Sequence, residues 1–258
     1  MHAERAIPLP HPGSRRRLVL LASALGIAVQ ACGASREWPV YGGAPGGTRY
    51  SPLRQINTRN VHRLQPAWVY RCDDMRTRPA TTIQCNPLVL GGVVYLTSPG
   101  LKVIALDAAT GREKWIFDPW EDRPGGGVSR GLSWWESAAE KRLFTAAGNF
   151  LFALDPETGR PVPEFGRSGR IDLRDGLDRD LVRQSVGLTT PGVVYRDLII
   201  IGSRVDDSPA ARAPGHIRAY DVRTGQRRWI FHTIPHPGEP GHETWPPDAW
   251  KTAAGGNA

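Results

Sequence analysis

The chain has 258 residues, 40% of them hydrophobic, with 33 basic side chains against 25 acidic ones and a net charge of +8. This hydrophobic content is ample for a packed core and excludes an intrinsically disordered protein. Most of the basic residues are arginines scattered among acids, which disfavours the clustered basic face of a nucleic-acid-binding protein.

The first 32 residues are typical of an export leader. Arg15-Arg16-Arg17 is a basic region, and Leu18 to Val29 is an apolar stretch that is short for a membrane span but suits a signal peptide. Small residues before Cys32 resemble a bacterial lipoprotein cleavage site, which predicts Cys32 as the lipidated residue. Plain secretion and an uncleaved anchor remain alternatives. All three predict a periplasmic domain, residues 33–258, which a lipidated Cys32 would hold at the membrane surface.

Three apolar runs follow the leader, at residues 88–96, 142–146 and 193–202. Beyond the leader, no stretch keeps a sustained 3.6-residue apolar period. The chain is therefore predicted to be all-β.

An Asp-x-x-Thr-Gly motif follows each run, starting at Asp107, Asp155 and Asp221. The Asp side chain can hydrogen-bond the backbone of a turn, and Gly tolerates positive φ, so each copy predicts a β-hairpin. The first two copies are 48 residues apart, close to the roughly 40–50 residues of a four-stranded propeller blade, and the last two are 66 apart. We therefore expect an insertion at 160–186, within a partial β-propeller of about three to four antiparallel blades.

Cysteine and histidine give weaker signals. In an exported protein Cys72 and Cys85 are able to form a disulfide, and two free thiols in neighbouring strands are the alternative. His232, His236 and His242 fall in a Pro/Gly-rich loop without a paired cysteine or the spacing of a zinc site, so we interpret them as surface residues.

The segments between the repeats resemble a known family. Trp38-Pro39-Val40-Tyr41-Gly42-Gly43, then Gly47 to Asn57, then Ala67-Trp68 are similar to the opening of the quinoprotein dehydrogenases. These enzymes depend on pyrroloquinoline quinone (PQQ) and include membrane glucose dehydrogenase and methanol dehydrogenase. The resemblance runs from about Trp38 to the end of the chain. It implies an eight-bladed propeller with PQQ near its axis and a bound Ca²⁺ or Mg²⁺.

The resemblance also implies which side chains hold the cofactor. Arg130 matches an arginine that meets a PQQ carboxylate, and a guanidinium is a rigid fork suited to that partner. Trp229 aligns with a tryptophan that stacks on the quinone plane. The other implied cofactor contacts are Gln84, Thr189, Thr190, Ser203 and Arg204.

A hard cation requires oxygen ligands, and the resemblance places Asp207, with its neighbour Asp206, at that site. Glu243 stands near the place where relatives use an asparagine. Gly125-Gly126-Gly127-Val128 replaces the adjacent cysteines of methanol dehydrogenase, which favours the glucose dehydrogenase-like branch.

The same resemblance implies the N-terminal part of a dehydrogenase that oxidises glucose or a related alcohol and passes electrons to ubiquinone or a cytochrome. In relatives the catalytic base comes from later blades, so no catalytic residue is assigned here and the chain alone is predicted to be inactive. A C-terminal half chain completing the ring is a second hypothesis. The alternative function is an exported lipoprotein propeller that serves as a scaffold without catalysis.

Overall fold

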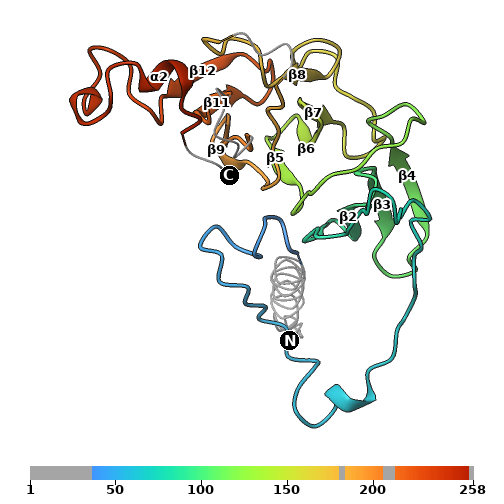
Figure 1. Ribbon diagram of the computed structural model, residues 1–258. Helices are drawn as coiled ribbons and strands as arrows, with labels where there is room; N and C mark the ends of the chain where they lie inside the picture. The colour runs from blue at the N-terminus through green and yellow to red at the C-terminus, as the bar shows by residue number, and fades with distance from the viewer. Residues whose placement is uncertain (1–36, 180–183, 206–212, 256–258) are drawn as a thin grey trace, which may run out of the picture.

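The computed structural model describes residues 37–179, 184–205 and 213–255 (Figure 1). Three four-stranded antiparallel sheets follow one another along the chain, which confirms the all-β, partial-propeller prediction. The first contains β1 (Leu88–Leu90), β2 (Val93–Thr97), β3 (Val103–Asp107) and β4 (Glu113–Phe117). The second contains β5 (Ser133–Glu136), β6 (Lys141–Ala147), β7 (Phe150–Leu154) and β8 (Arg170–Asp172). The third contains β9 (Val193–Tyr195), β10 (Leu198–Ile201), β11 (Ile217–Asp221) and β12 (Arg227–Phe231).

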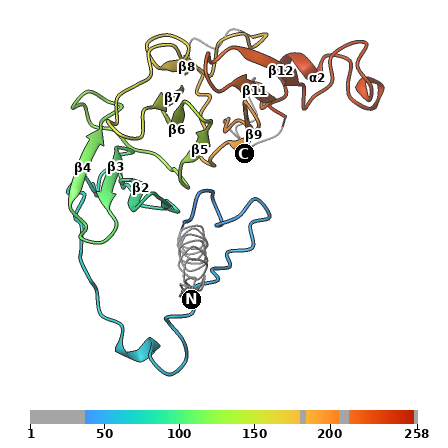
Figure 2. The ribbon, with the colours of Figure 1, turned by 180° about the vertical axis from the view of Figure 1, so that it is seen from behind.

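Helical structure in the described part of the chain is confined to short turns: η2 (Val61–Arg63), η3 (His242–Thr244) and α2 (Ala249–Thr252). None of these helices has the length and apolarity needed to cross a bilayer. The sheets form an arc in which β5 and β9 lie on the inner side and β4, β8 and β12 on the outer side, as both views show (Figures 1 and 2).

Two of the predicted apolar β runs are hairpins. Residues 88–96 divide at Gly91-Gly92 into β1 and β2, and residues 193–202 divide at Arg196-Asp197 into β9 and β10. Gly91 and Gly92 both have positive φ, 56° and 76°, as a tight two-residue turn requires. The expected insertion at 160–186 contains β8, so part of it completes the second sheet.

The three Asp-x-x-Thr-Gly motifs form the predicted turns. In the first, Thr110 donates its backbone N–H to the Asp107 carboxylate at 2.8 Å, and Asp155 and Asp221 accept the same bond from Thr158 and Thr224. Each motif glycine has φ close to +70°. The carboxylate thus replaces a backbone acceptor inside the turn and fixes where the following strand begins.

The middle sheet is covered on both faces because its strands alternate. Leu151 and Ala153 of β7 face a core shared with the third sheet, whereas Phe152 and Leu154 face a core shared with the first. Successive side chains of a strand point to opposite faces, so this one strand contributes to two hydrophobic cores. The fold is therefore a series of sheets joined by inter-sheet cores, as in a propeller.

Two tryptophan rings, those of Trp68 and Trp115, each pack against the glycine of an Asp-x-x-Thr-Gly turn. Trp68 donates its indole N–H to Ala108 O at 3.1 Å, and Trp115 donates to Pro156 O at 3.0 Å. A Cβ built on Gly111 would lie 2.5 Å from the Trp68 ring, and one on Gly159 would lie 2.4 Å from the Trp115 ring. The absence of a side chain at these glycines is what lets each indole cover the next turn.

Candidate functional site: a cavity on the inner side of the arc

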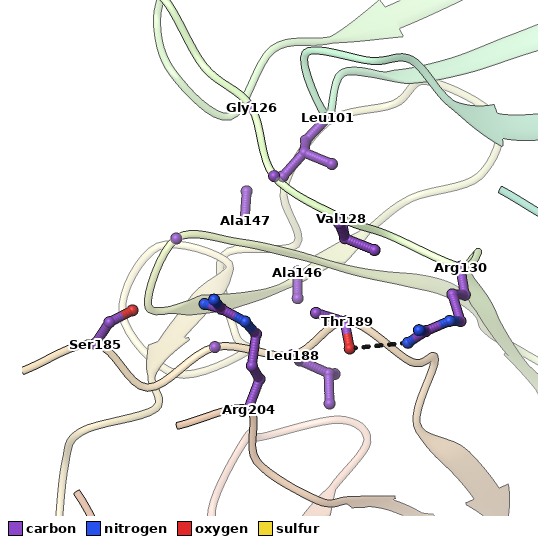
Figure 3. Close-up of a pocket in the computed structure, with 13 residues that line it drawn as sticks. Leu101, Gly126, Val128, Arg130, Ala146, Ala147, Ser185, Leu188, Thr189 and Arg204 are labelled. Carbon is purple, nitrogen blue, oxygen red and sulfur yellow. Dashed lines mark hydrogen bonds between the residues drawn. The ribbon is translucent and has the colours of Figure 1, made fainter. Parts of the chain in front are cut away.

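A cavity of about 660 Å³ lies where three inner segments run side by side. Asn86 donates its backbone N–H to Arg130 O at 2.9 Å, and Arg130 donates its own to Thr189 O at 2.8 Å. Gly187 and Arg204 exchange two backbone hydrogen bonds. The lining comes from the approach to β5, the β6–β7 turn and the segments around β9 and β10 (Figure 3).

Two arginines give this cavity its charge. Figure 3 shows the guanidinium groups of Arg130 and Arg204 on either side of Leu188 and Thr189. Arg130 Nη1 donates to the hydroxyls of Thr189 and Thr190 at 3.2 and 3.4 Å, and these contacts orient the planar guanidinium group. Within the described residues, neither arginine forms an ion pair with a carboxylate. The cavity therefore offers two guanidinium groups to an anionic ligand.

The floor of the cavity is built from small residues. Gly126, Gly127, Ala146, Ala147 and Gly148 all line it. Side chains this small bring the backbone close to a ligand and leave room for a flat ring system. Leu101 and Leu188 add apolar surface beside the two arginines.

Of the seven predicted cofactor contacts, the structure brings Arg130, Thr189 and Arg204 together in the cavity and places Thr190 next to them. Ser203 is buried and points into the protein: its hydroxyl donates to His216 O and accepts from Arg218 Nη2, both at 3.1 Å. Gln84 is exposed ahead of β1 and does not line the cavity.

Trp229 also lies away from the cavity lining. It belongs to β12, the outer strand of the third sheet, and pairs with Ala219 as Trp115 pairs with Ala105 in the first sheet. Its ring is 40% exposed. Its position is that of a blade tryptophan equivalent to Trp115, and its stacking on a quinone stays a prediction.

Of the three predicted metal ligands, only Glu243 lies within the described residues. Glu243 is exposed in η3 and does not line the cavity, and Asp206 and Asp207 lie outside the described residues, as does Cys32.

Cys72 and Cys85 are both free thiols rather than a disulfide, and Cys85 Sγ accepts a hydrogen bond from Thr97 N at 3.2 Å. Burial is the main cause that raises the pKa of both thiols.

A histidine cluster was missed by the sequence prediction. One ring nitrogen from each of His216, His232 and His236 lies within 4.8 Å of the other two. The His232 and His236 side chains are each 20% exposed, so they are half-buried members of a cluster and not the simple surface residues that we expected. His216 is buried at 1% exposure. Burial and then the His232 imidazole lower the pKa of His216 to about 4. The four-residue spacing of His232 and His236 was a visible signal, but nothing in the sequence joins His216 to them.

The fold and the cavity together define a propeller-type protein with an arginine-lined cavity on the inner side of its blades. Residues 38–258 match the family model of the PQQ-dependent glucose/ethanol/alcohol dehydrogenase β-propeller domain. The chain belongs to this family.

Individual relatives agree with this assignment. Quinoprotein glucose dehydrogenase A of Acinetobacter calcoaceticus is 31% identical over 78% of this chain, and quinohemoprotein alcohol dehydrogenase of Comamonas testosteroni is 31% identical over 85%. The crystal structure of the Comamonas testosteroni enzyme superposes with a TM-score of 0.68 at 28% identity, covering 90% of this chain and 34% of that one. The chain spans only 28% and 30% of the length of these two relatives.

Proposed function

We propose that this chain forms the first blades of a PQQ-dependent dehydrogenase and that its arginine-lined cavity holds part of the cofactor. The observation that carries the proposal is the pair Arg130 and Arg204 on a floor of glycine and alanine. PQQ is a flat tricarboxylate, and this donor set suits a planar anion: the guanidinium forks bind carboxylates and the small residues accept the ring system.

The chain's own residues would bind and orient the cofactor. Thr189 and Thr190 hold the Arg130 guanidinium in place, and the backbone pairing of Gly187 with Arg204 fixes the second arginine. Leu101 and Leu188 would exclude water from the edge of the ring. Bound PQQ supplies a two-electron oxidant, a chemistry that no side chain of the protein possesses.

Relatives named for glucose and for alcohols favour an alcohol or an aldose as the substrate of the whole protein, with ubiquinone or a cytochrome as the acceptor. A Ca²⁺ or Mg²⁺ beside the cofactor, ligated by Asp207 or Asp206, and a periplasmic location at the membrane through Cys32 belong to the same proposal. The non-catalytic scaffold is disfavoured, because the family match and these relatives are dehydrogenases.

Binding of PQQ to the full chain tests the cavity assignment. We expect Arg130→Ala and Arg204→Ala each to weaken binding about 10–100-fold, since a hydrogen bond to a charged group contributes about 1.5–3 kcal/mol. Arg196→Ala is the matched control, because Arg196 lies in the β9–β10 turn and does not line the cavity. Equilibrium dialysis and quenching of tryptophan fluorescence measure the affinity. Equal affinities for all three variants and the unmodified chain would refute the assignment.

A further inference from the structure

We propose that His216, His232 and His236, together with Asp178, form a binding site for a divalent transition-metal ion of the zinc class. His216 directly precedes β11, His232 directly follows β12, and His236 lies in the loop beyond it. One ring nitrogen of each lies within 4.8 Å of the other two. This site is separate from the arginine-lined cavity, which contains none of these residues. The inference does not depend on the proposed cofactor.

His216 is the strongest indication of an absent ligand. Its side chain is buried, and neither ring nitrogen has a hydrogen-bond partner among the described residues. A buried polar atom without a partner costs about 1–3 kcal/mol, so native proteins rarely keep one without a ligand, water or ion beside it. The two neighbouring imidazoles stand beside this ring, with centroids 4.6 and 5.9 Å away.

A carboxylate lies between two of the rings. Asp178 Oδ2 is 2.9 Å from His236 Nε2, and Asp178 Oδ1 is 3.8 Å from His216 Nε2. Three histidines and one carboxylate make a four-coordinate set of N and O ligands, which suits Zn²⁺ and also Co²⁺, Ni²⁺ or Cu²⁺. Ca²⁺ and Mg²⁺ prefer all-oxygen ligands and would not be selected here.

Glu239 supplies the outer support that metal-binding histidines usually have. Its Oε1 is 2.7 Å from His232 Nδ1, and its Oε2 accepts the backbone N–H of His236 at 2.8 Å. The first contact leaves Nε2 of His232 as the free nitrogen and fixes the ring's orientation. A carboxylate behind a ligating imidazole raises its basicity and typically matters 10–100-fold in affinity.

Binding requires a modest rearrangement. His232 and His236 are stacked with centroids 3.8 Å apart and planes within 4°, so their lone pairs run parallel. Zn–N bonds of about 2.1 Å need the nitrogens to converge, and rotation of the two side chains achieves this. Both residues follow or end β12, so no strand pairing has to break.

The test uses the full chain after chelator treatment and dialysis, with Zn²⁺ titrated by calorimetry and Co²⁺ by its visible absorption. We expect one equivalent to bind, with the intense absorption of four-coordinate Co²⁺ and a rise in the thermal midpoint. His232→Gln and His236→Gln should each weaken binding at least tenfold. Glu239→Gln, which leaves all ligands in place, should also weaken it by about 10–100-fold.

His242→Gln is the matched control. His242 lies in the same loop, and its Nδ1 contacts Pro235 O at 3.0 Å rather than the cluster. Circular dichroism selects the folded variants for comparison. The proposal is overturned if the folded unmodified chain binds no stoichiometric Zn²⁺, or if the binding survives unchanged in His232→Gln and His236→Gln, which would place the ion elsewhere.

Discussion

Single glycines decide how closely the sheets can approach. Gly159 has φ of 71°, and a Cβ there would lie 2.4 Å from the Trp115 ring. We expect Gly159→Ala to lower the free energy of unfolding by about 2–4 kcal/mol, because an unfavourable backbone conformation adds to overpacking against the indole. Urea unfolding followed by circular dichroism measures the change.

Gly92→Ala separates these two causes. Gly92 also has positive φ, 76°, but a Cβ there meets nothing within 4 Å. This variant should lose only the backbone contribution, about 1 kcal/mol. Equal losses in the two variants would show that the contact between Trp115 and Gly159 does not limit the packing.

The motif aspartate Asp221 connects stability to pH. At Asp221 burial pushes the pKa upward, but the backbone N–H groups of Thr224 and Arg223 and the Thr224 hydroxyl outweigh it, and the net pKa is lowered. A lowered pKa gives stability that is present above the unfolded value of about 3.9 and is lost as pH falls through the folded value. We expect the unmodified chain to exceed Asp221→Asn in stability at pH 6, and this difference to shrink in acid. A pH-independent difference in urea midpoints would contradict the assignment.

At the scale of secondary-structure elements, one buried arginine ties two sheets together. Arg218 of β11 is fully buried and donates from Nη1 to Leu173 O, just beyond β8, at 2.6 Å, and from Nη2 to Ser203 Oγ at 3.1 Å. Burial is the main cause that lowers the pKa of its guanidinium. We expect Arg218→Lys to destabilise the protein by about 2 kcal/mol, because a lysine ammonium group cannot form both hydrogen bonds of the planar guanidinium.

Arg228→Lys is the control for that substitution, since Arg228 is exposed on β12. It should change the free energy of unfolding by less than about 0.5 kcal/mol. Comparable losses in both variants would mean that the buried hydrogen bonds of Arg218 contribute nothing.

The hairpin turns could be predicted because their chemistry is local. The candidate site was predicted only in part, because it depends on long-range geometry. The Asp-x-x-Thr-Gly turns depend on contacts within three residues, so their residues alone specify them. Ser203 and Arg204 were both expected at the cofactor, yet neighbouring residues of an extended segment point to opposite sides, and only Arg204 reaches the cavity.

The histidine cluster was beyond sequence reasoning for a different reason. His216 directly precedes β11 and His232 directly follows β12, and the antiparallel pairing of these strands brings the two ring centroids to 4.6 Å. Register between strands depends on tertiary packing, so a prediction without it cannot decide which distant imidazoles meet.

Across the whole molecule, the first and third sheets present equivalent rows of side chains. Leu88, Tyr95, Ala105 and Trp115 face one another across the first sheet, and Val193, Ile200, Ala219 and Trp229 do so across the third. The row of the first sheet is covered by the second sheet. No sheet within the described residues covers the row of the third, where Val193 is 66% exposed and Trp229 40%.

The two tryptophans should therefore respond differently to the same substitution. Trp115→Ala removes a ring that packs on Gly159 and bonds Pro156 O, and should lower the free energy of unfolding by about 3 kcal/mol. Trp229→Ala removes a ring with no such neighbour on its outer side, and should lower it by less than about 1 kcal/mol while reducing binding of a hydrophobic dye to the open face. Urea unfolding and dye fluorescence on the two variants measure these effects. A loss at Trp229 as large as that at Trp115 would show that the outer face of the third sheet is already covered within this chain.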